Sequence, residues 1–222
     1  MFTHKDYKLE ELDTETIDGK RFYVTPTGKL PSITTVLSIL SRDSIQKWRK
    51  RVGEVQANAI STRASRRGTS VHQMCEDYIN NQYDSKKFLP NDRETFNSLK
   101  PVLDKHIDNV YAQEVPLWSE YLGVAGRVDC IAEWDGKIAV IDFKTSRKLK
   151  KKEYISNYFQ QCAAYAVMWE ERTGLPINKI VVVIAVDGEE PQVFEERRDN
   201  YIYECVKTIA QYRREQNGYF AS

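Results

Sequence analysis

Apolar and polar residues alternate on both sides of a turn signal in residues 126–146. Two runs rich in β-branched and aromatic residues flank Asp135-Gly136, a dipeptide typical of a two-residue type I′ turn. Apolar side chains occupy both faces of these runs. Ile131, Ile138 and Val140 are expected on one face, and Val128, Cys130, Ile141 and Phe143 on the other. Strands that are apolar on both faces are usually central and covered on both sides, so the pattern predicts a buried β-hairpin.

The predicted turn sets a register in which Asp129 lies opposite Asp142. Directly opposed residues share a face, with Cβ atoms about 4.5–5.5 Å apart. Lys144 lies two residues beyond Asp142, on the same face. Two like charges so placed destabilise a sheet unless a cation lies between them, which predicts a divalent-metal site with an attendant lysine. The alternatives are a surface pair of acids salt-bridged to Arg127 or Lys144, or a bulge that turns Asp129 to the opposite face.

The rest of the pattern predicts helices before the hairpin, and a helix, two strands and a final helix after it. The expected elements are a strand at 20–24, a helix opening at 30–33 with Ser32 as N-cap, a basic helix from Asp43 or Ser44 to Ala64, a separate helix at 70–81 after Gly68, a helix at 91–110 kinked or split by Pro101, strands at 110–118, 126–134 and 137–143, a helix at 152–172 stopped by Gly174-Leu-Pro176, strands at 179–186 and 192–195, and a helix at 198–216. This order predicts an α/β fold with a mixed central sheet flanked by helices. We expect a single domain over residues 1–222, with a mainly helical part at 1–110 and a sheet core at 111–222.

Composition places the chain among ordinary globular proteins, with 222 residues, 41% hydrophobic and 29% charged. No apolar run approaches membrane-spanning length, and residues 1–10 lack the layout of a secretory signal or transit peptide. We therefore expect a cytoplasmic protein of a bacterium or a phage-infected cell, without a membrane partner. Four scattered cysteines without a C-x-x-C motif (Cys75, Cys130, Cys162 and Cys205) are expected to be reduced core residues.

The net charge of +1 hides two basic clusters, at residues 42–67 and 144–152. Either cluster alone favours a plainer interpretation, a solvated helix face or a charged loop. Together they flank the predicted acid site, which suits a polyanion whose phosphate approaches a metal. Trp48 in the first cluster could stack on a base or anchor a core. The residues expected to contact DNA are Trp48, Arg49, Arg51, Arg63, Arg66, Arg67, Arg127, Thr145, Ser146, Arg147 and Lys148.

Five motifs follow one another along the chain: Gly68-Thr-Ser-Val-His72, Glu114, Gly126-Arg-Val-Asp129, Ile141-Asp-Phe-Lys-Thr145 and Gln161-Cys-Ala-Ala-Tyr165. In this combination the chain resembles the RecB-like branch of the PD-(D/E)XK nucleases. Within that branch it is similar to the mitochondrial genome maintenance exonucleases and their phage relatives, which cut single-stranded DNA. The likeness spans residues 30–194. It departs from the superfamily pattern at Val128, where the name places a proline, and the second acid is Asp142 rather than a glutamate.

The resemblance implies a role for each matching residue. It makes Asp129, Asp142, Lys144, Gln161 and Tyr165 catalytic, and it implies metal ligation by His72, Asp129, Asp142, the backbone carbonyl of Phe143 and Glu114. From the residues alone, plainer readings stay open. His72 could pair with Glu76 one helical turn away, Glu114 could be a surface glutamate, and Gln161 with Tyr165 could be a buried polar residue beside a core tyrosine.

Taken together, these observations predict a deoxyribonuclease that depends on Mg²⁺ or Mn²⁺, because oxygen-rich ligation with one imidazole suits those ions better than zinc. The expected activity is exonucleolytic hydrolysis of phosphodiester bonds in single-stranded DNA, during replication, repair or recombination. Two alternatives remain: a structure-specific endonuclease, and a non-catalytic module of the same fold that binds single-stranded DNA.

Overall fold

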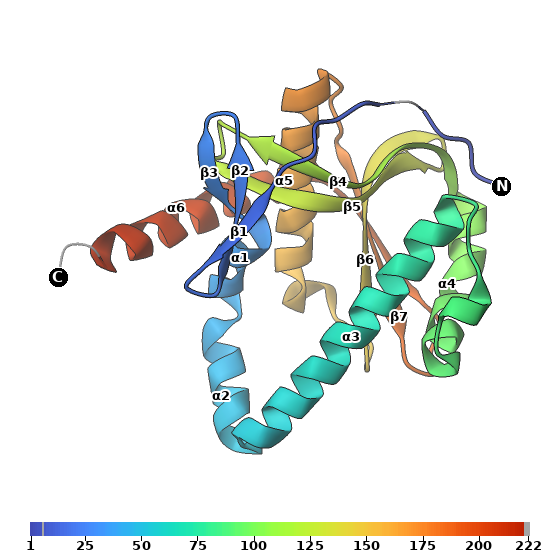
Figure 1. The fold of residues 1–222 in the computed structure, drawn as a ribbon, viewed down its shortest axis with the longest axis horizontal. Coiled ribbons are helices and arrows are strands. Elements are labelled where there is room, and N and C mark those ends of the chain that lie inside the picture. The colour runs from blue at the N-terminus through green and yellow to red at the C-terminus, as the bar shows by residue number, and fades with distance from the viewer. Residues whose placement is uncertain (6, 220–222) are drawn as a thin grey trace.

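Figure 1 shows the computed structural model of the protein, which describes residues 1–5 and 7–219. The strands are β1 (Thr14–Ile17), β2 (Lys20–Thr25), β3 (Gly28–Pro31), β4 (Ile107–Ser119), β5 (Val124–Trp134), β6 (Lys137–Ser146), β7 (Lys179–Val186) and β8 (Gln192–Arg197). The α-helices are α1 (Ile33–Leu37), α2 (Arg42–Val52), α3 (Glu54–Ile79), α4 (Pro90–His106), α5 (Ser156–Thr173) and α6 (Ile202–Tyr219).

A five-stranded sheet forms the centre of the molecule, in the order β4-β5-β6-β7-β8. All neighbouring strands are antiparallel except β6 and β7, which are parallel and joined through α5. A parallel pair needs a long crossover connection, and an 18-residue helix supplies it here. The predicted mixed sheet with flanking helices is thereby confirmed.

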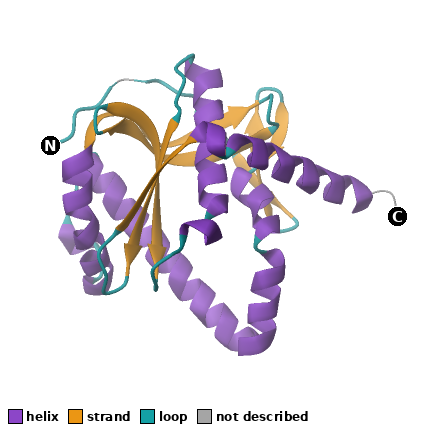
Figure 2. Ribbon diagram, turned by 180° about the vertical axis from the view of Figure 1, so that it is seen from behind, coloured by secondary structure: helices purple, strands orange, loops and turns teal. Residues whose placement is uncertain are grey.

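Helices cover both faces of this sheet (Figures 1 and 2). On one face, α3 and α4 pack against apolar side chains that include Cys130, Ile141 and Phe143. On the other face, α5 packs against a second cluster that includes Ile131 and Val140. Residues of β5 and β6 are therefore buried on both sides, as their near-continuous apolar pattern predicts.

The hairpin between β5 and β6 has the predicted register. Trp134 pairs with Lys137, and the pairing continues to Cys130 opposite Ile141. Both turn residues have positive φ, 51° at Asp135 and 72° at Gly136, as a type I′ turn requires. The local prediction from the Asp-Gly signal is confirmed.

Beyond Cys130 the strand β5 departs from simple alternation. Val128 packs in the same apolar cluster as Ile131 and Val140, so its predicted place on the face of Cys130 is wrong. The neighbouring strand β4 contains Glu114, whose φ of 46° is outside the extended region. A left-handed residue bends a strand and changes which side chains share a face. The bend therefore occurs where the acidic residues are.

The helices before the sheet differ from the prediction in where they break. The chain bends at Gly53, which has a φ of 84°, and α3 then runs unbroken through Gly68. The predicted break at Gly68 is wrong because glycine lowers helix propensity without forbidding a helix, whereas Gly53 adopts a backbone that other residues avoid. α2 begins at Arg42, one or two residues before the predicted caps. α4 also continues through Pro101 without being split.

The segment before α1 is richer in strands than predicted. β1, β2 and β3 form a three-stranded antiparallel sheet, of which the sequence pattern had indicated only the middle strand. β1 has no buried residue, and β3 is only four residues long. Neither therefore shows the apolar alternation by which a strand is predicted. Ser32 does precede α1 in the N-cap position, where its hydroxyl contacts Thr34.

α2 and the first half of α3 form a helical hairpin that stands away from the sheet (Figure 2). No residue of α2 is buried, and the buried side chains of α3 lie mainly beyond Gly68, at Val71, Met74, Cys75 and Ile79. Trp48 on α2 is partly exposed and belongs to no apolar cluster of the described residues, so the structure does not support the core-anchor reading.

Two further expectations concern residues spread along the chain. All four cysteines are buried and unpaired, as predicted, and burial raises the pKa of each thiol. In the part of the chain that the structure describes, no helix combines the length and apolar character needed to cross a membrane.

Candidate active site

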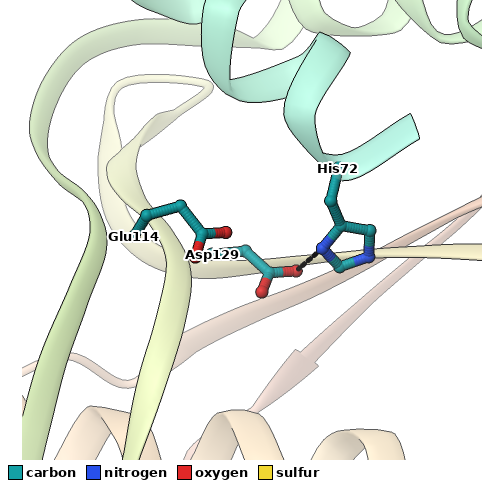
Figure 3. Close-up of side chains that lie close together, drawn as sticks. All are labelled: His72, Glu114 and Asp129. Atoms are coloured by element: carbon teal, nitrogen blue, oxygen red, sulfur yellow. Dashed lines mark ion pairs between the residues drawn. The ribbon is translucent and has the colours of Figure 1, made fainter. Parts of the chain in front are cut away.

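Three side chains from three elements meet at the bend of β4 and β5. Figure 3 shows His72 pointing from α3 toward Asp129 on β5, with Glu114 of β4 beside them. One potential ligand atom from each residue lies within 4.8 Å of the other two. His72 Nδ1 is 3.4 Å from Asp129 Oδ2. The structure thus brings together three of the predicted metal ligands.

Asp129 also joins the two strands of the hairpin. Its Oδ2 accepts a hydrogen bond of 2.8 Å from the backbone N–H of Phe143. The regular pairing of β5 with β6 ends one residue earlier, at Cys130 and Ile141. The carboxylate of Asp129 therefore accepts from a backbone N–H of β6 at the point where the regular strand pairing stops. This contact fixes the orientation of the carboxylate.

Asp142 lies on the α5 side of the sheet, in a second polar group. It is 1% exposed and forms an ion pair through Oδ2 with Lys144, while its Oδ1 accepts a 2.9 Å hydrogen bond from Gln161 Nε2. Among the described residues, Asp142 is not part of the 4.8 Å cluster around Asp129. Besides burial and the opposing charge of Lys144, the charge of Asp129 raises the pKa of Asp142, so the two carboxylates lie near one another. That both are aimed at one spot stays a prediction.

The α5 face supplies three polar or aromatic side chains to this second group. Gln161 contacts Asp142, and Tyr165 is buried. A Cβ added at Gly126 would lie 2.7 Å from the Tyr165 ring, so the glycine of the Gly126-Arg-Val-Asp129 motif makes room for that tyrosine. Tyr158, which the sequence reasoning missed, has its ring 5.4 Å from Lys144 Nζ. Its position three residues before Gln161 on one helical face was the available signal.

Burial and mutual repulsion shift the pKa values of the acids. Burial, followed by the charges of Asp129 and Glu76, raises the pKa of Glu114 to about 8. Burial raises the pKa of Asp142 to about 6, although the Lys144 ammonium opposes this shift. Burial alone would lower the pKa of Lys144, but the carboxylates of Asp142 and Asp129 outweigh it and raise the pKa. At neutral pH the Asp142–Lys144 pair is therefore ionised.

The cluster of His72, Glu114 and Asp129 fits a divalent cation. Its donors are carboxylate oxygens and one imidazole nitrogen, the set that suits Mg²⁺ or Mn²⁺. The raised pKa of Glu114 reflects first its burial and then the negative charge of Asp129 beside it, and a bound cation would offset both costs. The predicted ligation by Asp142 and by the Phe143 carbonyl stays a prediction.

The pKa of Glu114 makes the stability of the metal-free protein depend on pH. The folded protein holds a proton on Glu114 up to about pH 8, whereas the unfolded chain loses it near 4.5. Since the folded state binds more protons in this window, the free energy of unfolding should fall as pH rises from about 5 to 8. Mn²⁺ binding should strengthen over the same range, because the ligand must be deprotonated.

Thermal denaturation across pH 5–8, with and without Mn²⁺, measures this effect. In the metal-free protein, the melting temperature should decline with pH less steeply in Glu114→Gln, because the carboxyl group of Glu114 no longer contributes to the decline. If the variant declines as steeply as the parent protein, Glu114 is not the group responsible.

Five of the residues predicted to contact DNA line one cavity of about 850 Å³ at the end of β6, where its lining starts one residue beyond Lys144: Arg63, Arg67, Thr145, Ser146 and Arg147. It lies between α3, the start of α4 and the ends of β6 and β7. Five acidic residues also line it: Asp92 and Glu94 on α4, and Asp187, Glu189 and Glu190 after β7. Arg67 forms an ion pair with Asp187 across it, while Arg67 Nε is buried without a hydrogen-bond acceptor among the described residues.

The other predicted DNA contacts are dispersed. Arg51 and Arg66 are exposed on α2 and α3, and Lys148 is exposed after β6. Arg49 is engaged within the helical hairpin, where it bonds Glu54 and Asn58. The guanidinium of Arg127 bonds the backbone carbonyl of Glu114 and the carboxylate of Glu11 instead of facing the cavity.

Known nucleases are similar to this chain in sequence. The sequence model of the PD-(D/E)XK nuclease superfamily matches residues 93–218. Mitochondrial genome maintenance exonuclease 1 of Homo sapiens is 29% identical over 175 residues, 72% of this chain. The protein of the same name from Xenopus tropicalis is 27% identical over 177 residues, 74% of this chain. The chain spans 50% of the length of each of these curated relatives.

Among solved structures, one described as a candidate exonuclease from Eubacterium rectale matches 68% of both chains, with 15% identity and a TM-score of 0.47.

Proposed function

The chain belongs to the PD-(D/E)XK nuclease superfamily, and from this premise we propose that it is a metal-dependent exonuclease acting on single-stranded DNA. The observation that carries the proposal is the cluster of His72, Glu114 and Asp129 directly beside the buried Asp142–Lys144 pair. A site for a divalent cation next to a positioned ammonium group suits phosphodiester hydrolysis.

Each residue of the site has a distinct part in the proposed reaction. Bound Mg²⁺ or Mn²⁺ would polarise the phosphodiester and supply positive charge as the bond breaks. The Phe143 N–H fixes the orientation of Asp129, whose carboxylate oxygens would bind the metal ion. Lys144, held by Asp142 and flanked by the Tyr158 ring, orients the attacking water or stabilises the charge of the leaving oxygen. Gln161 keeps Asp142 oriented toward that lysine.

The cavity beside the site suggests where the strand lies. Its arginines are on α3 and at the end of β6, which is the strand that carries Asp142 and Lys144. A nucleic-acid backbone that follows this arginine wall would reach the catalytic groups, while the acidic wall on α4 would repel it from the opposite side. The helical hairpin of α2 and α3 would guide a single strand, with Trp48 available to stack on a base.

The proposal that cleavage starts from a strand end, as in an exonuclease, is supported by the names of the two relatives. The two curated relatives are named as mitochondrial exonucleases. An enzyme of this kind would process single strands during DNA replication, repair or recombination.

A panel of labelled DNA substrates tests the proposal. Linear single strands should be degraded with Mg²⁺ or Mn²⁺ and remain intact with a chelator, whereas circular single strands of the same sequence should remain intact throughout. Cleavage of circles as fast as linear strands would identify an endonuclease instead. Salt-sensitive binding without cleavage under any metal condition would identify a non-catalytic binding module.

A further inference from the structure

Arg127 is held by two hydrogen bonds that leave its guanidinium turned toward β4. One terminal nitrogen donates to the backbone carbonyl of Glu114, and the other donates to Glu11 Oε2 at 2.7 Å. Glu11 comes from the segment before β1 and its side chain is 70% exposed. The planar fork of arginine can make both bonds at once, which lysine cannot reproduce.

Glu114, the acceptor of the first bond, has an uncommon backbone conformation. Its φ is 46°, in the left-handed region that residues other than glycine, asparagine and aspartate rarely adopt. The pairs on either side of it are regular, with Gln113 opposite Cys130 and Val115 opposite Val128. A rare conformation of this kind persists only when surrounding contacts impose it, and such outliers cluster at functional sites.

From these contacts we infer that Arg127 is a positioning residue, which fixes the left-handed backbone of Glu114 and thereby directs its carboxylate toward His72 and Asp129. The inference rests on the proposed metal site. It replaces the expectation that Arg127 contacts DNA, because both terminal nitrogens of its guanidinium already have protein acceptors.

The direction of the effect on metal binding separates positioning from simple electrostatics. The positive charge of Arg127 lies close enough to Glu114 to lower its pKa, so the charge by itself opposes a bound cation. If charge were its only influence, Arg127→Gln would tighten Mn²⁺ binding and Arg127→Lys would leave it unchanged. If Arg127 positions Glu114, both variants weaken Mn²⁺ binding, by about 10-fold or more as for other groups that orient a ligand.

Calorimetric titration of the DNA-free protein with Mn²⁺ makes this measurement without any readout of activity. Arg197→Lys is the matched control, because that arginine is exposed on β8 and should leave the affinity unchanged. Should Arg127→Lys fail to fold in thermal denaturation, Glu11→Gln removes only the exposed partner and should weaken Mn²⁺ binding by a smaller factor.

A double-mutant cycle identifies the route of the effect. In a Glu114→Gln background, Arg127→Lys should cause no further loss of Mn²⁺ affinity, because the carboxylate that it positions is already gone. Equal losses in both backgrounds would overturn the inference, as would unchanged affinity in Arg127→Lys.

DNA binding provides an independent readout. The dependence of single-strand affinity on salt should be the same in Arg127→Lys, Arg127→Gln and the parent protein, whereas loss of a phosphate contact would reduce the slope by about 0.7 in Arg127→Gln. A parent protein that binds Mn²⁺ without cutting DNA would remove the proposed function and leave this inference intact. A parent protein that binds no Mn²⁺ would overturn both.

Discussion

Lys144→Ala should lower kcat for DNA cleavage by about 10²–10³-fold, the cost of removing one preorganised group that stabilises charge in a transition state. Lys144 is the cation in contact with Asp142, and its position on β6 is set by that ion pair and by the Tyr158 ring.

The same substitution should also destabilise the protein, so activity and folding must be measured separately. Removing one partner of a buried ion pair leaves an uncompensated charge and typically costs about 3–5 kcal/mol. The double variant Asp142→Asn with Lys144→Ala should recover much of that loss in urea denaturation but none of the activity. Lys137→Ala, at the exposed start of the same strand, is the control and should preserve both. Near parental cleavage by Lys144→Ala would exclude the proposed role of the lysine.

Asp129→Asn should reduce Mn²⁺ affinity by more than about 100-fold, because it removes a ligand charge and not merely a group that orients one. Cleavage should fall by about 10²–10³-fold, corresponding to several kcal/mol of lost charge stabilisation. The asparagine keeps an oxygen that can still accept the hydrogen bond from the Phe143 N–H.

Asp129→Ala provides the comparison that separates chemistry from structure. It should lose activity to the same extent and, in addition, about 1–3 kcal/mol of stability, because the Phe143 N–H is left without its acceptor. Denaturant titration and Mn²⁺ calorimetry on both variants make the test. Equal stability of the two variants would mean that the hydrogen bond does not hold the strands together at this point.

The parts of the site that depend on local geometry could be predicted from the sequence. The Asp135-Gly136 turn fixes the first five pairs of the hairpin, so the approach of Asp129 to β6 follows from counting residues. The left-handed backbone of Glu114 could not be predicted. It accepts a hydrogen bond from Arg127 on the neighbouring strand, and it leaves no signature in the pattern of β4.

The helix boundaries likewise could be predicted only in part from the sequence. A glycine lowers helix propensity wherever it stands, so the sequence offers both Gly53 and Gly68 as breaks. Only tertiary structure decides between them: α3 continues past Gly68 to bury Val71 and Met74 against the sheet, while Gly53 turns the chain where few side chains are buried. The motif match to nuclease families was informative because it depended on the order of several residues rather than on any one periodicity.

The hairpin of α2 and α3 has a consequence for how such a protein can diversify. Because α2 buries no side chain, its residues contribute little to the free energy of unfolding, and changes in its length or sequence leave the sheet undisturbed. The residues of the candidate active site lie instead between two tightly packed layers, where most substitutions are costly. Selection or engineering can therefore change the residues of this outlying element while the packed layers around the sheet stay the same.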